Sequence, residues 1–258
     1  MQKGFIFDLD GTVYLDNHLI DGADEVIQRL TDRGDKVTFL TNKSTETICS
    51  YVKKLNRLGI EVSEKNVINS NYLVALYLKK NVRHDERVMV IGEKPLTDEL
   101  SYMGIRLTKK SQEASYVVLG WDRYFTYDKL NDAFQAWRHG AKIIATNPDR
   151  TCPVEGGQVP DCGAIIGAVE GATGENIDIV LGKPSLLAAE YIVKEVIRLP
   201  PEQCYMIGDR LETDIQMGID YGMQTVLVLT GITNMNLVES SSIKPDIILD
   251  SIQKVIDL

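Results

Sequence analysis

The stretch Phe7-Asp8-Leu9-Asp10-Gly11-Thr12 ends an apolar run that starts at Gly4, and it places two carboxylates two residues apart before a glycine. The run Gly4–Leu9 has the length and apolar content of a buried strand. Gly11 allows the chain to turn away sharply after it. Because ligands bind at the carboxyl ends of the strands in open parallel sheets, Asp8 and Asp10 favour a binding site there. The same residue types are common in ordinary turns, so the pair alone leaves both interpretations open.

Apolar strands alternate with helix-period segments at both ends of the chain. Gly22–Arg33 repeats apolar residues at helical spacing and is followed by the strand-like run Lys36–Leu40. This β-α-β order implies parallel strands joined by right-handed crossovers, and the predicted fold class is α/β with a Rossmann-like parallel-sheet core. The remaining predicted elements of this core are the strands Asn66–Asn69, Cys204–Ile207, Thr225–Leu229 and Asp246–Leu249, and helices at Thr47–Leu58 and near Asp214–Tyr221.

Residues 76–178 repeat the α/β alternation by themselves. Their predicted strands are Arg87–Ile91, Tyr116–Leu119 and Lys142–Ala145, and Tyr127–His139 has helical periodicity. The carboxylates that could do chemistry lie on both sides of this segment and not inside it. We therefore predict a core formed by residues 1–75 plus 179–258, with residues 76–178 inserted as a second α/β domain.

Composition excludes several classes of function. With 28 Lys+Arg against 37 Asp+Glu, the net charge of the 258 residues is −9, which argues against a nucleic-acid partner. A hydrophobic fraction of 44% is enough for a substantial core and excludes a mainly disordered chain. We see neither a membrane-spanning apolar run nor a signal peptide, so we expect a cytoplasmic protein without a membrane partner. The four scattered cysteines are expected to be reduced thiols.

A second carboxylate pair follows another apolar strand, in Met206-Ile207-Gly208-Asp209-Arg210-Leu211-Glu212-Thr213-Asp214. Taken alone, Asp209 and Asp214 could simply cap a helix. If their strand lies beside that of Asp8, however, carboxylates from both strands converge, and crowded negative charges require a cation or a proton between them. Oxygen ligands without a nearby His or Cys favour a hard ion, most plausibly Mg²⁺.

Two further segments could complete a phosphate site. The strand Lys36–Leu40 leads into Thr41-Asn42, whose hydroxyl and amide, with backbone N–H groups at a helix start, suit phosphate oxygens. Gly182-Lys183-Pro184 places a compact cation just before a helix that Pro184 can begin. Each is weak alone, because Thr41-Asn42 could be a helix cap and Lys183 a solvated surface charge.

In their order along the chain, these segments resemble the four motifs of the haloacid dehalogenase superfamily. The motifs are Asp8-x-Asp10-Gly11-Thr12, Thr41-Asn42, Gly182-Lys183-Pro184 and Gly208-Asp209-(x)4-Asp214. The long insert between the second and third motifs resembles class IIA of that superfamily, which includes NagD-like enzymes, 4-nitrophenylphosphatases and arabinose-operon sugar phosphatases. The resemblance implies the superfamily's fold, with the insert as a cap of the C2 type.

The resemblance also implies a role for each motif residue. Asp8 would be the nucleophile that forms an aspartyl-phosphate, and Asp10 the acid and base for the leaving oxygen and the attacking water. Thr41, Asn42 and Lys183 would hold the phosphoryl oxygens. Mg²⁺ would be bound by the side chains of Asp8 and Asp209 and the backbone carbonyl of Asp10, with Asp214 orienting Lys183 or a metal-bound water.

The cap would close over the site and supply the contacts that select a substrate. Within Thr146–Pro153, which resembles a cap loop of the family, Asn147, Asp149 and Cys152 are the candidate specificity residues. Cys152 could equally be a small core residue of the cap, and Tyr14 could stack on substrate or, as we favour, pack inside the fold. Because relatives often pair through the cap, a homodimer is a further expectation.

The predicted function is Mg²⁺-dependent hydrolysis of phosphomonoesters of small metabolites. One alternative is a phosphotransferase or phosphomutase that shares the aspartyl-phosphate step and releases no inorganic phosphate. An alternative of another class is a non-catalytic module that binds or senses a phosphorylated metabolite, but its phosphoacceptor would not need the complete set of acids.

Overall fold

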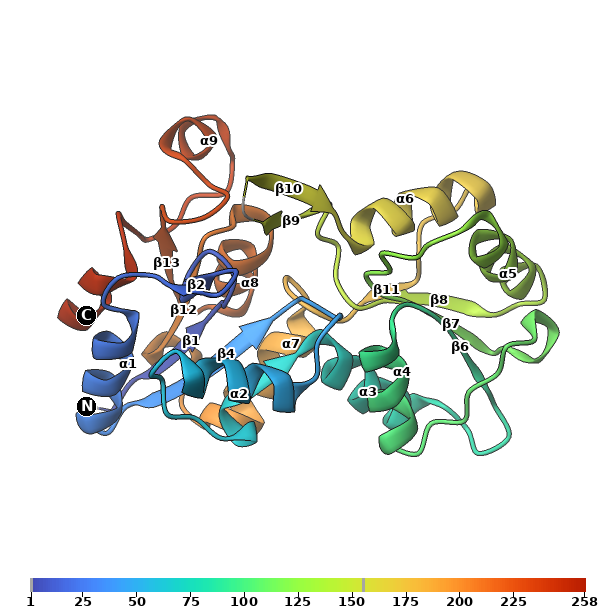
Figure 1. Cartoon of the computed structure of the whole chain (residues 1–258), viewed down its shortest axis with the longest axis horizontal. Helices are drawn as coiled ribbons and strands as arrows, with labels where there is room; N and C mark the ends of the chain where they lie inside the picture. Colours follow the sequence, from blue (N-terminus) through green and yellow to red (C-terminus); the bar gives the residue numbers. More distant parts are fainter. Residues whose placement is uncertain (1, 155) are drawn as a thin grey trace.

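The computed structural model of the chain describes residues 2–154 and 156–258, and it contains two parallel sheets in separate lobes (Figure 1). The larger sheet has the order β14-β13-β12-β1-β4-β5. Its strands are β1 (Gly4–Phe7), β4 (Lys36–Thr41), β5 (Val67–Asn69), β12 (Cys204–Gly208), β13 (Gln224–Val228) and β14 (Ile247–Leu249). The predicted α/β class with a parallel-sheet core is confirmed.

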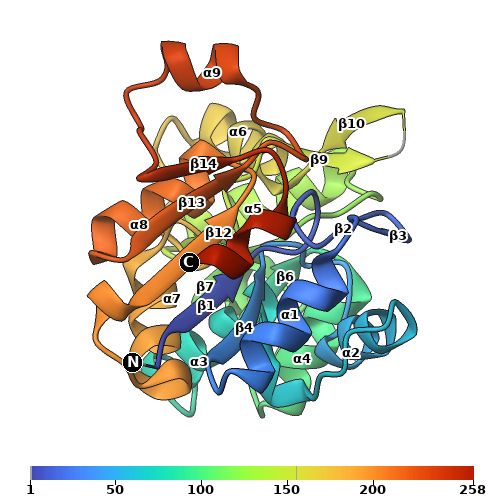
Figure 2. The same cartoon turned by 90° about the vertical axis from the view of Figure 1, so that its left-hand side faces the viewer.

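Alternating side chains of β1 explain why helices cover both faces of this sheet (Figure 2). Phe5 and Phe7 point to one face, where they pack in a cluster with α1 (Ala23–Asp32), α2 (Ile48–Arg57) and the turn η6 (Ile252–Asp257). Ile6 points to the other. There it packs with α7 (Leu186–Tyr191), the π-helical turn η3 (Ile192–Ile197) and α8 (Gln216–Tyr221). A central strand buried on both faces reads as a continuous apolar run, as this one does.

The insert folds around its own sheet, which has the order β11-β8-β7-β6. The strands are β6 (Val88–Ile91), β7 (Tyr116–Leu119), β8 (Lys142–Ala145) and β11 (Ile179–Val180). On one face lie α5 (Tyr127–Arg138) and α6 (Cys162–Thr173), and on the other α4 (Lys94–Tyr102) and part of α3 (Ser70–Asn81). An antiparallel hairpin of β9 (Thr151–Val154) and β10 (Gly157–Pro160) extends between the lobes (Figure 1).

The predicted domain boundaries fall inside shared elements. The boundary at 75/76 lies within α3, whose Val74 and Leu78 already pack with the insert residue Val118. Beyond 178, the strand β11 still pairs with β8 of the insert. The sheet of the insert thus continues two residues past the boundary that the sequence predicts, and the division into core and cap stays a prediction.

Smaller elements complete the fold. A flap of β2 (Tyr14–Leu15) and β3 (His18–Leu19) follows the first motif, and α9 (Met235–Ser240) lies near the carboxyl end of the chain. The remaining turns are η1 (Glu64–Asn66), η2 (Ser111–Glu113), η4 (Pro201–Gln203) and η5 (Leu211–Ile215). All four cysteines are free, as expected.

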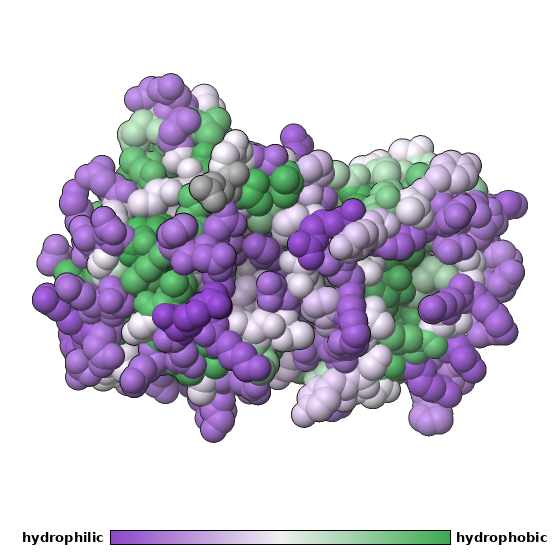
Figure 3. Space-filling model, in the orientation of Figure 1, coloured by the Kyte–Doolittle hydropathy of each residue, from purple (hydrophilic) through white to green (hydrophobic). Residues whose placement is uncertain are grey.

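The surface in Figure 3 is mostly hydrophilic, with hydrophobic side chains showing in smaller groups between the polar ones. Among the described residues, none of the helices combines the length and the apolar character that crossing a bilayer requires.

Candidate active site

The carboxyl ends of neighbouring strands bring the two acid pairs together. β1 pairs in parallel with both β12 and β4, so that Phe7 lies opposite Ile207 on one side and Phe39 on the other. Strand β1 ends at Phe7, and Asp8 follows at once, held by a 2.8 Å hydrogen bond from its N–H to the carbonyl of Ile207. This register places the first residue after β1 beside the end of β12, from which Asp209 projects.

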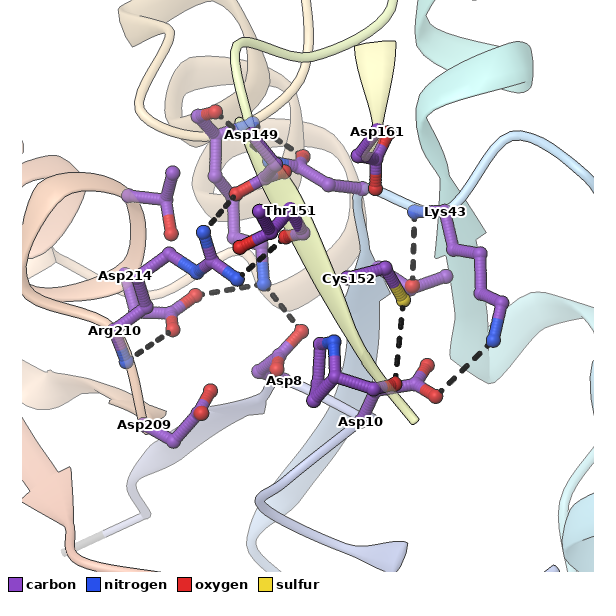
Figure 4. A pocket seen from close by; sticks show the side chains of 15 residues that line it. Asp8, Asp10, Lys43, Asp149, Thr151, Cys152, Asp161, Asp209, Arg210 and Asp214 are labelled. Atoms are coloured by element: carbon purple, nitrogen blue, oxygen red, sulfur yellow. Dashed lines mark hydrogen bonds and ion pairs between the residues drawn. The ribbon is translucent and has the colours of Figure 1, made fainter. Parts of the chain in front are cut away.

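Three buried carboxylates form the centre of the site (Figure 4). Asp8, Asp209 and Asp214 each offer one oxygen, and these oxygens lie within 4.8 Å of one another. The backbone is shaped for Asp209 in particular. Its Oδ2 accepts a 2.6 Å hydrogen bond from the N–H of Ile232, and a Cβ atom on Gly231 would come within 1.9 Å of that oxygen. Only glycine at 231 leaves room for this carboxylate.

Lys183 is the cation inside this cluster. Its side chain is only 3% exposed, and Nζ contacts Asp8 and lies 2.6 Å from Oδ1 of Asp214. Burial by itself lowers the pKa of Lys183, but the attraction of Asp214 and Asp8 outweighs burial and raises it. The lysine is therefore a permanent positive charge and not a solvated surface residue. Its helix begins later than predicted, because Ser185 and not Pro184 caps α7.

One lysine does not neutralise three carboxylates. Burial raises the pKa of Asp8 well above its usual range, and Asp214 and Asp209 raise it further while Lys183 opposes the rise. Burial and then Asp214 raise the pKa of Asp209 to about 7. These carboxylates are all oxygen donors, the kind that Mg²⁺ prefers, and a divalent cation among them would relieve the repulsion. The residues present thus fit a hard metal ion.

Asp10 differs from these three acids because a lysine approaches it from outside the cluster. Lys43 Nζ lies 3.3 Å from Oδ1 of Asp10. The other oxygen, Oδ2, is buried and has no hydrogen-bond partner among residues 2–154 and 156–258. The backbone beyond Asp10 is fixed by a 2.7 Å bond from the N–H of Gly11 to the carbonyl of Tyr14. A buried carboxyl oxygen that has no partner can exchange a proton with a ligand.

The second motif is built differently from the prediction. Helix α2 begins at Ile48 with Thr47 as its cap, so Thr41, the last residue of β4, and Asn42, which follows it, do not lie at a helix start. The hydroxyl oxygen of Thr41 accepts a 3.2 Å bond from the N–H of Lys43. Both side-chain hydrogens of Asn42 are engaged, at 2.8 Å with Asp149 and at 3.0 Å with the carbonyl of Lys183. The Asn42 amide therefore bonds to other residues of the site, Asp149 and the Lys183 backbone.

Of the three cap residues predicted to set specificity, two line the same cavity as Asp8. These are Asp149 and Cys152. Asn147 is fully buried behind them and donates to Asp149 at 2.9 Å and to Asp161 at 3.3 Å, so it supports the loop and does not line the cavity. Burial raises the pKa of the Cys152 thiol to about 12, which keeps it protonated. Tyr14 packs in the core, as we favoured.

Several residues that line the cavity were not predicted from the sequence. They are Lys43, Thr151, Pro153, Asp161, Arg210 and Thr213. Arg210 joins the lobes, since its guanidinium lies 3.4 Å from Asp149 and donates a 2.8 Å bond to the carbonyl of Thr151. Lys43 and Arg210 each follow directly after a motif residue. A cation next to a motif was the sequence signal that could have identified them as site residues. The cavity measures about 40 Å³, room for only a few waters.

A buried carboxylate cluster with one lysine at the ends of parallel strands, roofed by an inserted lobe, defines a class of hydrolase. Residues 5–106 match the family described as "Haloacid dehalogenase-like hydrolase", and residues 180–255 match "HAD-hyrolase-like". The chain is 41% identical to the sugar-phosphatase AraL of Bacillus subtilis over 99% of its length and 92% of that protein. It therefore belongs to the haloacid dehalogenase-like hydrolase family.

Solved structures agree with this membership. The 4-nitrophenylphosphatase of Thermotoga maritima is 33% identical, with a TM-score of 0.92 over 100% of this chain and 97% of that one. A glycerol phosphate phosphatase of Mycobacterium tuberculosis, solved in complex with magnesium, is 28% identical with a TM-score of 0.86, over 97% of this chain and 75% of that one. The family and these relatives make this chain a phosphatase, and the predicted resemblance is confirmed.

Proposed function

We propose that this phosphatase hydrolyses phosphomonoesters of small metabolites through an aspartyl-phosphate on Asp8. The observation that carries this proposal is the placement of two different carboxylates around one cavity. Asp8 lies against Lys183 inside the buried cluster, whereas Asp10 keeps one buried oxygen without a partner. One carboxylate is thus placed to attack phosphorus and the other to handle the proton of the leaving group.

In the first step, an oxygen of Asp8 forms a bond to phosphorus while the bond from phosphorus to the leaving oxygen breaks. Asp10 gives its proton to that leaving oxygen, so the product leaves as an alcohol. In the second step, Asp10 takes a proton from water, whose oxygen attacks the phosphorus of the aspartyl-phosphate. The bond to Asp8 then breaks, and inorganic phosphate and the free carboxylate are restored.

Lys183, with backbone N–H groups of the Thr41-Asn42 loop, would hold the phosphoryl oxygens during both steps. A fixed cation that lies between Asp8 and Asp214 stabilises negative charge without having to reorient, which is the main contribution expected in phosphoryl transfer. Asp214 and Asn42 position the lysine, the first through its side chain and the second through a 2.8 Å bond from the Lys183 N–H.

We propose Mg²⁺ as the cofactor. The residues that would hold it are Asp8 and Asp209 through their side chains and Asp10 through its backbone carbonyl, and Asp214 lies close enough to contribute an oxygen as well. Bound there, Mg²⁺ would keep Asp8 ionised and neutralise charge on the phosphoryl group. The magnesium complex of the mycobacterial relative supports this choice.

We propose sugar phosphates and similar small phosphorylated metabolites as substrates, because relatives include a sugar-phosphatase and a glycerol phosphate phosphatase. The loop that carries Asp149 and Cys152 would contact the leaving group. A homodimer through residues 76–178 and a cytoplasmic location stay predictions from the sequence.

The test is release of inorganic phosphate from 4-nitrophenyl phosphate with Mg²⁺ present. Asp8→Asn removes the nucleophile at nearly constant shape, and we expect kcat to fall by about 10³-fold or more. The exposed residue Asp128 on α5 offers a matched Asp→Asn control that should keep full activity. Normal turnover by Asp8→Asn would contradict the assignment. Release of one phosphate for each nitrophenol separates hydrolysis from phosphotransfer.

A further inference from the structure

A second cavity adjoins the active site, and its lining is strongly basic. It measures about 300 Å³ and is lined by Asn17, Lys43, Glu46, Ser50, Tyr51, Lys53, Lys54 and Arg57. Four of these side chains are cations and one is a carboxylate, in a chain whose net charge is −9. Lys43 lines this cavity and the catalytic cavity alike, so the two spaces meet at one side chain.

The cations come mainly from one side of helix α2. Ser50, Lys54 and Arg57 are spaced four and three residues apart, which places them on the same face of the helix. Among the described residues, none of Lys53, Lys54 and Arg57 forms an ion pair with a carboxylate. Burial lowers the pKa of Lys54 and repulsion from Lys43 lowers it further, against the attraction of Asp10, Glu46 and Asp16.

Two buried tyrosines, Tyr14 and Tyr51, pack next to this cavity. Lys54 Nζ lies 3.6 Å from the centre of the Tyr14 ring, a close cation–π contact. Tyr14 is fully buried, and its hydroxyl has no hydrogen-bond partner within the described part of the chain. The hydroxyl of Tyr51 donates a 3.0 Å bond to the carbonyl of Lys43 and so fixes the backbone that joins the two cavities. The contact with the buried Tyr14 ring therefore helps to set the position of Lys54.

Lys43, the side chain that the two cavities share, lies beside Asp10, where a leaving group would depart. In Figure 4, Lys43 approaches Asp10 from the side away from Asp8, and the ion pair between Lys43 and Asp10 measures 3.3 Å. A phosphoryl group on Asp8 would have its leaving oxygen at Asp10, so the rest of the substrate would extend toward Lys43. A negative group there would meet the cations of α2.

We propose that this basic cavity binds a second anionic group, a carboxylate or a phosphate, carried by the leaving group of the substrate. The preferred substrates would then be phosphorylated acids or bisphosphates, and their neutral counterparts would react less well. This inference rests on the proposed function, because it uses the direction in which the leaving group departs from Asp8.

The test compares substrates that differ only in the distal charge. One pair is 3-phosphoglycerate and glycerol 3-phosphate, and the other is fructose 1,6-bisphosphate and fructose 6-phosphate. We expect kcat/KM to favour the anionic member of at least one pair by about tenfold, and the pair that responds identifies a carboxylate or a phosphate. The preference should shrink at high ionic strength because salt screens exposed cations.

Variants of the cavity residues test whether this cavity causes the preference for the anionic substrate. Lys54→Gln with Arg57→Gln should reduce the preference about tenfold, while Lys54→Arg with Arg57→Lys should retain it. Lys79→Gln, an exposed lysine on α3 outside both cavities, should also retain it. If the unaltered protein has nearly equal kcat/KM for the two members of each pair, the inference is wrong. It is also wrong if the double glutamine variant keeps the full preference. In that case the protein would still release phosphate from 4-nitrophenyl phosphate. A protein that releases no phosphate from this substrate would refute the proposed function.

Discussion

Asp10 carries one carboxyl oxygen against Lys43 and one buried oxygen with no partner in the described structure. Asp8, two residues earlier, lies against Lys183 within the carboxylate cluster. Chemically identical side chains thus have different surroundings, and the two roles that we propose for them rest on that difference.

A substitution at Asp10 should affect substrates according to how much their leaving group needs a proton. We expect Asp10→Asn to lower kcat on a sugar phosphate by about 10²–10⁴-fold, because an alkoxide is a poor leaving group without protonation. The loss on 4-nitrophenyl phosphate should be smaller, since nitrophenolate leaves unprotonated. Equal losses on both substrates, measured by phosphate release, would argue against the role of acid.

Asp161 is a second residue whose surroundings have a measurable consequence. Burial, and then Asp149, raise the pKa of Asp161 to about 7. Because the folded state holds this proton more tightly than the unfolded chain, the stabilisation is present at low pH and is lost as pH rises toward 7 and beyond. Asp161 also caps α6, and asparagine can keep that cap.

We therefore expect Asp161→Asn to flatten the pH dependence of stability. Between pH 5 and pH 8 the unaltered protein should lose on the order of a few kcal/mol that the variant does not lose. Urea unfolding at the two pH values measures the difference. If the free energy of unfolding changes by the same amount in both proteins between these pH values, Asp161 does not titrate in this range.

At the scale of elements, Arg210 connects the loop after β12 to the cap hairpin. Its guanidinium reaches both Asp149 and the carbonyl of Thr151, the first residue of β9, and its side chain is 14% exposed. A planar fork can reach two acceptors at once, whereas a lysine ammonium is a single point charge. The link positions the hairpin over Asp8 and Asp10.

Arg210→Lys should keep the charge and lose the double contact. We expect kcat/KM to fall by about tenfold, because a loop misplaced by a small distance no longer orients the leaving group. The matched control is Arg123→Lys. Arg123 is a more exposed arginine, and its guanidinium contacts Glu93 outside the cavity. If both variants behave like the unaltered protein, the hairpin is positioned by other contacts.

At the scale of the whole molecule, metal binding and folding should be linked. The cluster of Asp8, Asp209 and Asp214 is assembled from β1 and the segment after β12, far apart in sequence, and exists only in the folded chain. A ligand that binds only the folded state adds about 2.7 kcal/mol at a hundred times its dissociation constant. For a chain of this size that corresponds to roughly 5 °C or more in Tm.

Mg²⁺ should therefore raise Tm, and EDTA should reverse the shift and abolish turnover. Asp209→Asn should remove most of the shift because it removes a ligand and one of the crowded charges. Differential scanning calorimetry with and without Mg²⁺ measures the effect. A Tm that does not respond to Mg²⁺ in the unaltered protein would contradict the metal site.

The sequence by itself determined the α/β class, the strands of the two parallel sheets except β11, and the four motifs. These follow from local rules: buried strands need apolar runs, helices need periodic apolar residues, and the chain turns at Gly11 just past the first acid pair. The order of Asp8, Thr41, Lys183 and Asp209 along the chain was enough to predict that they line one cavity, as they do.

Only the tertiary structure decided which partners these residues have. The contact of Arg210 with Asp149, the engagement of the Asn42 amide and the burial of Asn147 depend on how the two lobes meet, and no local pattern encodes that. The basic cavity likewise arises because α2 packs against the flap, where Lys54 contacts the Tyr14 ring and Arg57 donates to Asn17. Sequence periodicity fixes the face that a helix buries, but long-range packing fixes what its other faces meet.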